Sequence, residues 1–395
     1  MRRLIMSLFE RPLAQLGRRN LQTLPVAAAA RQLHGPSVDS IEPRPLCMES
    51  TGAEKQPPQT LRWGIAPVNL MTEDFATALS VLPAQRHSIT SCMDAYRSQA
   101  TSFANKHRVP KIYTSFEDLA RCPDVDAVYI SPLNAMHCEL CHLMLNHDKH
   151  VLCEQPLGMT EQQVVELVGK ARARGLFLME GIWPRCIPAY HILRHEIMRC
   201  KLGRIFAVDC TLGWQLPVAS PKAAEYAGVA KDLAPYGIQL ALWIYREVPQ
   251  QLRVLGKLNR DGIDVAADID LIFKGNRRAR LVLSAEQNLQ NTATIRGTKG
   301  SAIMNSLWCP TELRFENRDF QFELPVAERS THFNNRIALC YEAEEMRSCI
   351  LAGLTESSLF NHDESRLMVH LTSQIKEMLE EDDQHAAFQQ KQAVG

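Results

Sequence analysis

The sequence predicts an α/β fold with a doubly wound parallel sheet in its N-terminal half, followed by a C-terminal α+β domain with an open, mostly antiparallel sheet. From residue 61 to about 182, short apolar segments alternate with segments of helical spacing, which is the rhythm of βαβ units in a sheet covered on both faces. After residue 183 the apolar segments become longer, alternate with polar residues and follow one another with little intervening helix. That second rhythm is typical of an antiparallel or mixed sheet.

The elements follow in order from these patterns. In the first half we expect strands at 61–66, 87–93, 111–114, 126–131, 150–154 and 176–180, separated by helices at 73–82, 97–107, 136–146 and 161–175. In the second half we expect strands at 203–214, 251–259, 264–273 and 279–289, a helix at 232–247 and terminal helices at 337–353 and 363–381. The chain shows no internal repeat.

Bulk composition excludes several classes of protein. Lys plus Arg equals Asp plus Glu at 44 each, so nothing favours nucleic acid or an anionic membrane surface as a partner. No apolar run approaches the ~18 to 20 residues that span a bilayer. The 12 cysteines are scattered, mostly within apolar segments, which indicates free thiols in a reducing compartment.

Residues 1–35 differ from the rest of the chain. Six arginines stand against one acid, Glu10, and Leu4, Leu8 and Phe9 could form one face of a basic helix. This pattern predicts a mitochondrial transit segment and a matrix location; the alternatives are a disordered N-terminal arm and a cytoplasmic protein. Residues 36–60 are rich in Pro, Ser and Glu and are interpreted as a linker.

The stretch HVLCEQP (150–156) is a buried strand that stops on a carboxylate, an amide and a proline. The carboxyl ends of parallel strands are where α/β proteins place their chemistry, so Glu154 and Gln155 are candidate site residues. Gln155 can donate and accept hydrogen bonds, but it carries neither charge nor a titrating proton.

Two strand ends bear on nucleotide binding. The turn after 61–66 has Gly64, Ala66 and Asn69 where a dinucleotide motif wants three glycines, and it is compatible with a weakened dinucleotide site or with a mere connection. Asparagine tolerates a positive φ, so the turn could survive at Asn69. After 87–93, Asp94 suits a ribose 2′-hydroxyl whereas Arg97 suits a 2′-phosphate, and a solvated turn is equally compatible.

Two further segments carry candidate side chains. HCELCH matches the haem-attachment spacing at Cys138, Cys141 and His142, but it lies in a helix of a βαβ unit, so we interpret these as core residues and expect no metal; His137 lies near the strand ends. In KDLAPYGIQ, Tyr236 could pass a proton and Asp232 could orient a substrate, or the two could be a core residue and a helix cap.

The segments VLCEQP, LFLMEGIWPR, RGTKGSAIM and WCPTEL resemble the glucose–fructose oxidoreductase and inositol dehydrogenase family, in particular its dihydrodiol and D-xylose dehydrogenase subgroup, from about Leu61 to about residue 380. The resemblance implies a Rossmann domain at 61–182, a substrate and dimerisation domain at 183–385, a homodimer, NADP (or NAD) as cofactor, and a sugar or cyclic diol as substrate. It implies catalytic roles for Tyr236, Asp232 and position 155, and cofactor or substrate surroundings at Gly64, Asn69, Leu70, Asp94, Arg97, His137, Glu154, Trp183 and Arg185.

The sequence departs from the family pattern at informative places. The family has lysine where this chain has Gln155, glycine where it has Asn69, and glycine where it has Ala234. The loss of a lysine removes general acid–base help that is typically worth about 10²–10⁴ in rate. Tyr236 acting alone, or Lys231 reaching inward, could compensate. Two hypotheses follow: an NADP(H)-dependent oxidoreductase with an impaired site, or a catalytically silent relative that binds nucleotide or acts through its dimer surface.

Overall fold

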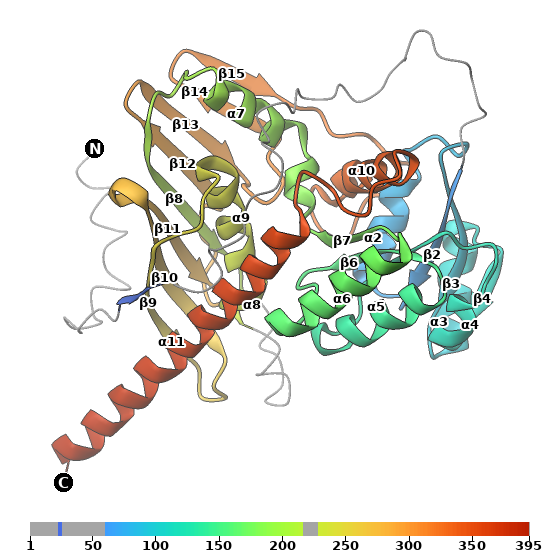
Figure 1. Ribbon diagram of the computed structural model, residues 1–395, viewed down its shortest axis with the longest axis horizontal. Helices are drawn as coiled ribbons and strands as arrows, with labels where there is room; N and C mark the ends of the chain where they lie inside the picture. The colour runs from blue at the N-terminus through green and yellow to red at the C-terminus, as the bar shows by residue number, and fades with distance from the viewer. Residues whose placement is uncertain (1–22, 26–59, 216–227, 395) are drawn as a thin grey trace.

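The computed structural model describes residues 23–25, 60–215 and 228–394, with side chains described for 60–215 and 228–381. The chain forms two sheets that lie side by side, each with its own helices (Figure 1). The predicted fold class is confirmed: a six-stranded parallel sheet is followed by a nine-stranded sheet that is antiparallel except where β11 pairs with β8. The transit and linker interpretations fall mostly outside the described residues.

The parallel sheet has the order β4-β3-β2-β5-β6-β7. Its strands are β2 (Leu61–Ala66), β3 (His87–Met93), β4 (Lys111–Tyr113), β5 (Ala127–Ile130), β6 (His150–Glu154) and β7 (Leu178–Gly181). The helices between them are α2 (Leu70–Leu79), α3 (Arg97–His107), α4 (Phe116–Ala120), the short η3 (Asn134–Met136), α5 (His137–Asn146) and α6 (Glu161–Arg174). The strand order reverses between β2 and β5, which is the position where doubly wound sheets bind ligands.

The nine-stranded sheet has the order β1-β9-β10-β11-β8-β12-β13-β14-β15. Its strands are β1 (Thr23–Pro25), β8 (Ile205–Gly213), β9 (Gln251–Leu258), β10 (Asp264–Phe273), β11 (Arg277–Ser284), β12 (Thr292–Gly297), β13 (Gly300–Asn305), β14 (Glu312–Phe315) and β15 (Arg318–Gln321). Its helices are η4 (Trp183–Cys186), α7 (Pro188–Met198), α8 (Val229–Asp232), α9 (Ala234–Tyr245), η6 (Lys274–Asn276), η7 (Arg336–Ala338), α10 (Leu339–Leu351) and α11 (His362–Val394).

The first helix begins earlier than expected. We expected it to begin at Glu73, but α2 begins at Leu70 because Asn69 caps it and supplies the partners of its first free N–H groups. The helix expected at 232–247 corresponds to α9, which begins at Ala234; Leu233 separates it from the short helix α8, which ends at Asp232. Pro235 lies in the first turn of α9, where its missing N–H costs nothing. Strands β12 to β15 were not among the expected elements.

The two halves are joined by the C-terminal helices. α10 packs on α2, and α11 runs from α6 of the first half to β9 of the second (Figure 1). A continuous apolar core includes Trp63 and Phe75 of the first half and Trp243 and Phe273 of the second. Residues from opposite ends of the chain therefore meet at the carboxyl ends of the parallel strands. This region is called the crevice below, after the place where doubly wound sheets bind ligands.

Candidate active site

Glu154 ends β6 and its carboxylate is oriented by the neighbouring strand. The hydroxyl of Tyr129, on β5, donates to Glu154 Oε1 at 2.6 Å. Tyr129 is completely buried and stacks on Phe75 of α2, with ring centroids 3.8 Å apart, so the donor cannot swing away. Burial raises the pKa of Tyr129, and the charge of Glu154 adds to this effect, so the phenol stays protonated and keeps donating.

Tyr236, in the first turn of α9, lies near Glu154 across the crevice. Burial raises its pKa, whereas the nearby guanidinium of Arg336 and a hydrogen bond from Trp183 act in the opposite direction; Glu154 raises it further. Trp183 is 2% exposed and its ring centroid is 6.2 Å from that of Trp308, which in turn is 5.9 Å from that of Trp214. Three of the residues expected at the site, Glu154, Tyr236 and Trp183, are therefore brought together.

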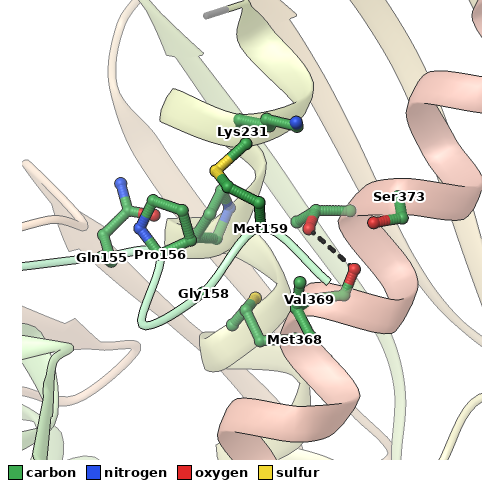
Figure 2. A pocket seen from close by; sticks show the side chains of 10 residues that line it. Gln155, Pro156, Gly158, Met159, Lys231, Met368, Val369 and Ser373 are labelled. Atoms are coloured by element: carbon green, nitrogen blue, oxygen red, sulfur yellow. Dashed lines mark hydrogen bonds between the residues drawn. The ribbon is translucent and has the colours of Figure 1, made fainter. Parts of the chain in front are cut away.

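Gln155 follows Glu154 and borders a narrow cavity of about 10 Å³, enough for roughly one water molecule. Its amide oxygen is buried and has no hydrogen-bond partner among the described residues. Lys231 lines the same cavity, but Figure 2 shows its ammonium group directed away from the Gln155 amide. Lys231 therefore does not stand in for the lysine that the resemblance implies at position 155.

Two ionisable side chains in the crevice, Arg336 and Glu342, come from the C-terminal part of the chain, and no sequence pattern indicated them. Arg336, in η7, has a raised pKa: burial acts to lower it, but Tyr236, Glu154, Tyr129 and Asp74 outweigh burial. Glu342, in α10, is completely buried, and neither of its carboxylate oxygens has a hydrogen-bond partner in the described parts of the chain. Burial and the charge of Glu154 raise the pKa of Glu342 well above its usual value, and Arg336 opposes them.

The turn between β2 and α2 is closed by Asn69. Its Oδ1 accepts from Met71 N–H at 2.9 Å and from Thr72 N–H at 3.0 Å, its Nδ2 donates to Ser131 O at 2.5 Å, and Thr72 Oγ1 accepts from Asn69 N–H at 2.8 Å. This is a capping box. Two N–H groups that a Rossmann helix offers to a pyrophosphate are thus occupied by a side chain of the same turn.

The backbone of this turn corrects one expectation. We expected Asn69 to be tolerated for its freedom at positive φ, but its φ is −161°, which is extended backbone. The reason for asparagine is its side-chain cap. Leu70, the next residue, is 53% exposed, while Gly64 lies within β2, where a Cβ would press on Val125 and Leu119.

Asp94 and Arg97 both follow the end of β3, but their side chains lie in different surroundings. Asp94 is 8% exposed, and its Oδ1 accepts from Tyr96 N–H at 2.8 Å. Arg97 is the first residue of α3 and is exposed. The carboxylate is therefore partly engaged within its own turn, while the guanidinium faces solvent.

His137 and Arg185 are placed as supports behind the crevice. His137 is 1% exposed and its Nδ1 lies 2.7 Å from Pro156 O, which fixes the turn after Gln155; burial lowers its pKa. Arg185 is completely buried and donates to Gln239 Oε1 and O, to Leu359 O and to Glu364 Oε1. The contacts of these two residues support structure, and four of the five N–H donors of Arg185 are used within the protein.

Asp232 belongs to a different cluster. Its Oδ2 accepts from Gly228 N–H at 3.2 Å, and burial raises its pKa to about 6, with Asp264 of β10 adding to the effect. Asp264 in turn accepts from Ala230 N–H and lies 3.8 Å from Lys376 Nζ of α11. The structure thus brings Asp232 to the α8–β10–α11 junction, and its described contacts do not include Tyr236.

The HCELCH segment occupies α5, as expected. Cys141 is buried, Cys138 is half-buried, and both are free thiols. Within the described ranges, no three His, Cys, Asp or Glu side chains gather in a way that could hold a metal ion. None of the described helices combines the length and apolar character needed to cross a membrane.

The strand order of the parallel sheet and the aromatic wall beside its strand ends define the class of the protein. It is a two-domain oxidoreductase fold with a dinucleotide-type parallel sheet and a second sheet. Residues 61–182 match the model described as the oxidoreductase family with an NAD-binding Rossmann fold, and residues 190–303 match the GFO/IDH/MocA C-terminal domain. The chain belongs to this GFO/IDH/MocA family, which confirms the resemblance.

Known relatives extend over most of the chain. The trans-1,2-dihydrobenzene-1,2-diol dehydrogenase of Macaca fascicularis is 35% identical over 321 residues, covering 80% of this chain and 96% of the relative. The Homo sapiens protein of the same name is 33% identical, covering 81% and 97%.

Solved structures share the fold at lower identity. The aldose-aldose oxidoreductase of Caulobacter crescentus has a TM-score of 0.70 at 16% identity, covering 82% of this chain and 98% of that one. A levoglucosan dehydrogenase in complex with NADH and levoglucosan has a TM-score of 0.70 at 17% identity, covering 81% and 98%. The Actinomadura kijaniata 3-ketoreductase KijD10, in complex with TDP-benzene and NADP, has a TM-score of 0.65 at 22% identity, covering 80% and 96%.

Proposed function

We propose that the chain is a nicotinamide-dependent dehydrogenase that oxidises a secondary alcohol of a sugar or cyclic diol, with NADP(H) as its preferred cofactor and weakened affinity for it. The observation that carries the proposal is the meeting of Tyr236, Trp183 and the Tyr129–Glu154 pair at the carboxyl ends of β5 and β6. A phenol beside an aromatic wall can hold a substrate hydroxyl and take its proton.

A carboxylate, a phenol and an aromatic wall are the side-chain types that suit the nicotinamide end of a dinucleotide, although the cavity beside Gln155, of about 10 Å³, admits the ring only if side chains around it move. When bound, the cofactor supplies the hydride acceptor. Glu154 and Gln155 at the end of β6 would border the ring, and the Tyr236 oxygen would receive the hydroxyl proton of the substrate. Trp183, Trp308 and Trp214 would exclude water and stack against the substrate ring.

At the phosphate end the cap of Asn69 competes with the pyrophosphate for the N–H groups of Met71 and Thr72, which is why we infer weak affinity. The preference for NADP(H) is supported by the exposed guanidinium of Arg97 and by the engagement of Asp94 with Tyr96 N–H. A relative's structure holds NADP and another holds NADH, so both cofactors belong in the test.

An equilibrium titration tests the proposal directly. Trp183 lies in the crevice, so a dinucleotide bound there should quench tryptophan fluorescence, and NADPH should do so at lower concentration than NADH. Turnover is then followed by the absorbance of the reduced cofactor with trans-dihydrodiols and pentoses as substrates. Oxidation of either class supports the proposal, and Tyr236→Phe should abolish turnover while leaving the quenching in place.

A second candidate is favoured by the capped turn. If Asn69 excludes the pyrophosphate, the chain is a catalytically silent relative that acts through its surface. Absence of quenching by either cofactor at millimolar concentration would favour this function. Quenching without turnover on any diol or pentose would indicate a nucleotide-binding protein that has lost its chemistry.

Assembly and location complete the proposal. Helices α9 and α11 pack on the nine-stranded sheet, and we infer that two chains pair through its opposite face, which light scattering of the purified protein would test.

We also infer import into mitochondria, with cleavage within residues 1–35. Residues Thr23–Pro25 pair with β9, so cleavage beyond Pro25 removes strand β1, and the size of the processed product reports this.

A further inference from the structure

Arg336 is carried into the crevice by a segment that crosses α2. The N–H groups of His332 and Phe333 donate to the two carboxylate oxygens of Asp74 at 2.6 and 3.1 Å, and His332 Nε2 lies 2.6 Å from Glu73 Oε2. Burial would raise the pKa of Glu73, but hydrogen bonds from Lys106 and His332 outweigh it. The segment is therefore fixed on α2 three residues before Arg336.

The guanidinium of Arg336 lies among the residues of the candidate site. It donates to Met71 Sδ at the start of α2, and its central carbon is 5.6 Å from the ring centroid of Trp183 and 5.1 Å from that of Phe333. Trp183 is the hydrogen-bond partner of Tyr236. The charged and titratable groups that face the guanidinium come from five elements besides its own: Asp74 of α2, Tyr129 of β5, Glu154 of β6, Tyr236 of α9 and Glu342 of α10.

Among the charged groups near Tyr236, Arg336 has the largest effect on its ionisation, and this effect favours the phenolate. Position 155, where the resemblance implies a lysine, holds an uncharged amide, and the ammonium group of Lys231 is directed away from it. This chain therefore has a positive charge in the crevice, the guanidinium of Arg336, which is part of the C-terminal domain.

We propose that Arg336 is a positioning residue that supplies the positive charge of the hydride-transfer crevice in place of a lysine at position 155. This inference rests on the proposed dehydrogenase function and specifies how its site works. With the cofactor bound, the electron pair of the substrate C–H bond would leave as hydride to the oxidised nicotinamide. The hydroxyl proton would pass to the Tyr236 oxygen, which first gives its own proton to solvent because burial raises the pKa of the free phenol. The alcohol would thereby be oxidised to a ketone and would reduce the bound nicotinamide, and Tyr236 would then release the proton it received to solvent. Arg336 stabilises the phenolate that accepts the proton.

Turnover of four variants separates charge from packing. Arg336→Gln should lower kcat/KM for diol or pentose oxidation by about 10²-fold, the usual effect of removing one preorganised electrostatic group. It should also shift the rising limb of the pH profile, which follows the deprotonation of Tyr236, to higher pH. Arg336→Lys keeps the charge and should retain most of the rate. Gln155→Lys placed in the Arg336→Gln background should restore activity from the other side of the crevice. Arg329→Gln, an exposed change seven residues earlier, should leave the rate unchanged.

A measurement that needs no cofactor, the pKa of Tyr236, tests the role of Arg336 separately from the proposed dehydrogenase function. Ultraviolet difference titration of tyrosinate, taken as the full chain minus Tyr236→Phe, reports the pKa of Tyr236 alone, and Arg336→Gln should raise it whereas Arg329→Gln should not. If this titration shifts but no variant, including Gln155→Lys, turns over any substrate, the proposed function fails and the charge assignment stands. An unchanged titration would overturn the inference. So would an Arg336→Gln variant that binds NADPH more tightly and turns over faster, because the guanidinium would then occupy the place of the nicotinamide ring.

Discussion

The hydroxyl of Tyr129 donates to Glu154 Oε1 at 2.6 Å, joining the carboxyl ends of two neighbouring parallel strands by a charge-assisted hydrogen bond. Because Tyr129 is locked against Phe75, this bond fixes the carboxylate that faces Tyr236. Tyr129→Phe removes the donor and keeps the stacked ring. We expect the free energy of unfolding to fall by about 1.5–3 kcal/mol, as for hydrogen bonds to charged groups, and kcat to fall more than cofactor affinity.

Urea unfolding and cofactor quenching measure the two effects of Tyr129→Phe separately. Tyr245→Phe is a matched control, since its hydroxyl donates to Arg278 O at 2.9 Å at the C-terminal end of α9, whereas Tyr236 lies in the first turn of that helix. That control should lose about 1 kcal/mol of stability and no activity. Equal losses of turnover in both variants would show that Tyr129 acts only on folding.

Asn69 gives the second prediction. Asn69→Gly removes the side chain that occupies Met71 and Thr72 N–H, and glycine is itself a tolerated N-cap, so the cap costs only a few tenths of a kcal/mol. Two freed donors should tighten NADPH binding by about tenfold, which corresponds to roughly 1.4 kcal/mol. Fluorescence quenching measures the affinity.

Ser115→Gly provides the control for Asn69→Gly. Ser115 caps α4 by accepting from Asp118 N–H at 3.2 Å, away from the strand-order reversal. This change should alter stability to a similar extent and leave cofactor affinity as it was. Weaker binding in Asn69→Gly would mean that the asparagine contacts the cofactor itself.

The sequence predicted the strands of the parallel sheet and their polar ends because buried strands, helix periodicity and turn residues are local signals; it did not predict β12 to β15. The expectation that Glu154, Trp183 and Tyr236 belong to one site came from the family resemblance. The prediction for Asn69 was wrong. The stretch N-L-M-T carries a helix-cap signal, because Thr72, three residues after Asn69, completes the capping box. The comparison with the glycine of the family pattern pointed to the φ angle instead. Glu73 and Asp74, at the start of the helix expected at 73–82, hold the segment before Arg336, and no local pattern indicated this role.

Arg336 and Glu342 could not be found from local pattern. They lie more than 180 residues beyond Glu154, and their place in the crevice depends on the path of one segment across α2. Arg185 shows the converse, because it matches a position near Trp183 but its donors are used by Gln239, Leu359 and Glu364. Sequence position next to a site residue does not fix which way a side chain turns.

Glu180, at the end of β7, provides a pH prediction. It is 3% exposed, and burial raises its pKa to about 7, against an ordinary value of 4.5. The folded state therefore holds this proton more tightly than the unfolded state, so the stability that protonation contributes is complete below about pH 4.5 and is lost as the pH rises through 7. The loss by pH 8 is up to about 3 kcal/mol.

Glu180→Gln should remove this dependence, because glutamine is neutral at every pH and can still accept from Leu157 N–H, which donates to Glu180 Oε1 at 3.1 Å. Urea unfolding at pH 5 and pH 8 should give similar stabilities at pH 5 and a more stable variant at pH 8. The exposed change Glu316→Gln serves as control and should follow the parent at both values. Parallel curves for Glu180→Gln and the parent would refute the raised pKa.

Arg185 gives the last prediction, which links the core to the crevice. Its guanidinium is completely buried, donates to Glu364 Oε1 at 3.0 Å and lies 4.7 Å from the ring centroid of Trp243. Arg185→Met leaves Glu364 without its main partner, and breaking a buried pair in this way costs about 3–5 kcal/mol. The double variant Arg185→Met/Glu364→Gln should recover part of that loss in urea unfolding, whereas Arg172→Met, which breaks only an exposed pair with Glu356, should cost at most about 1 kcal/mol. Because η4 carries both Trp183 and Arg185, the single variant should also change tryptophan fluorescence in the crevice. A fluorescence spectrum identical to that of the parent, together with a loss below 1 kcal/mol, would mean that η4 is held by its other contacts.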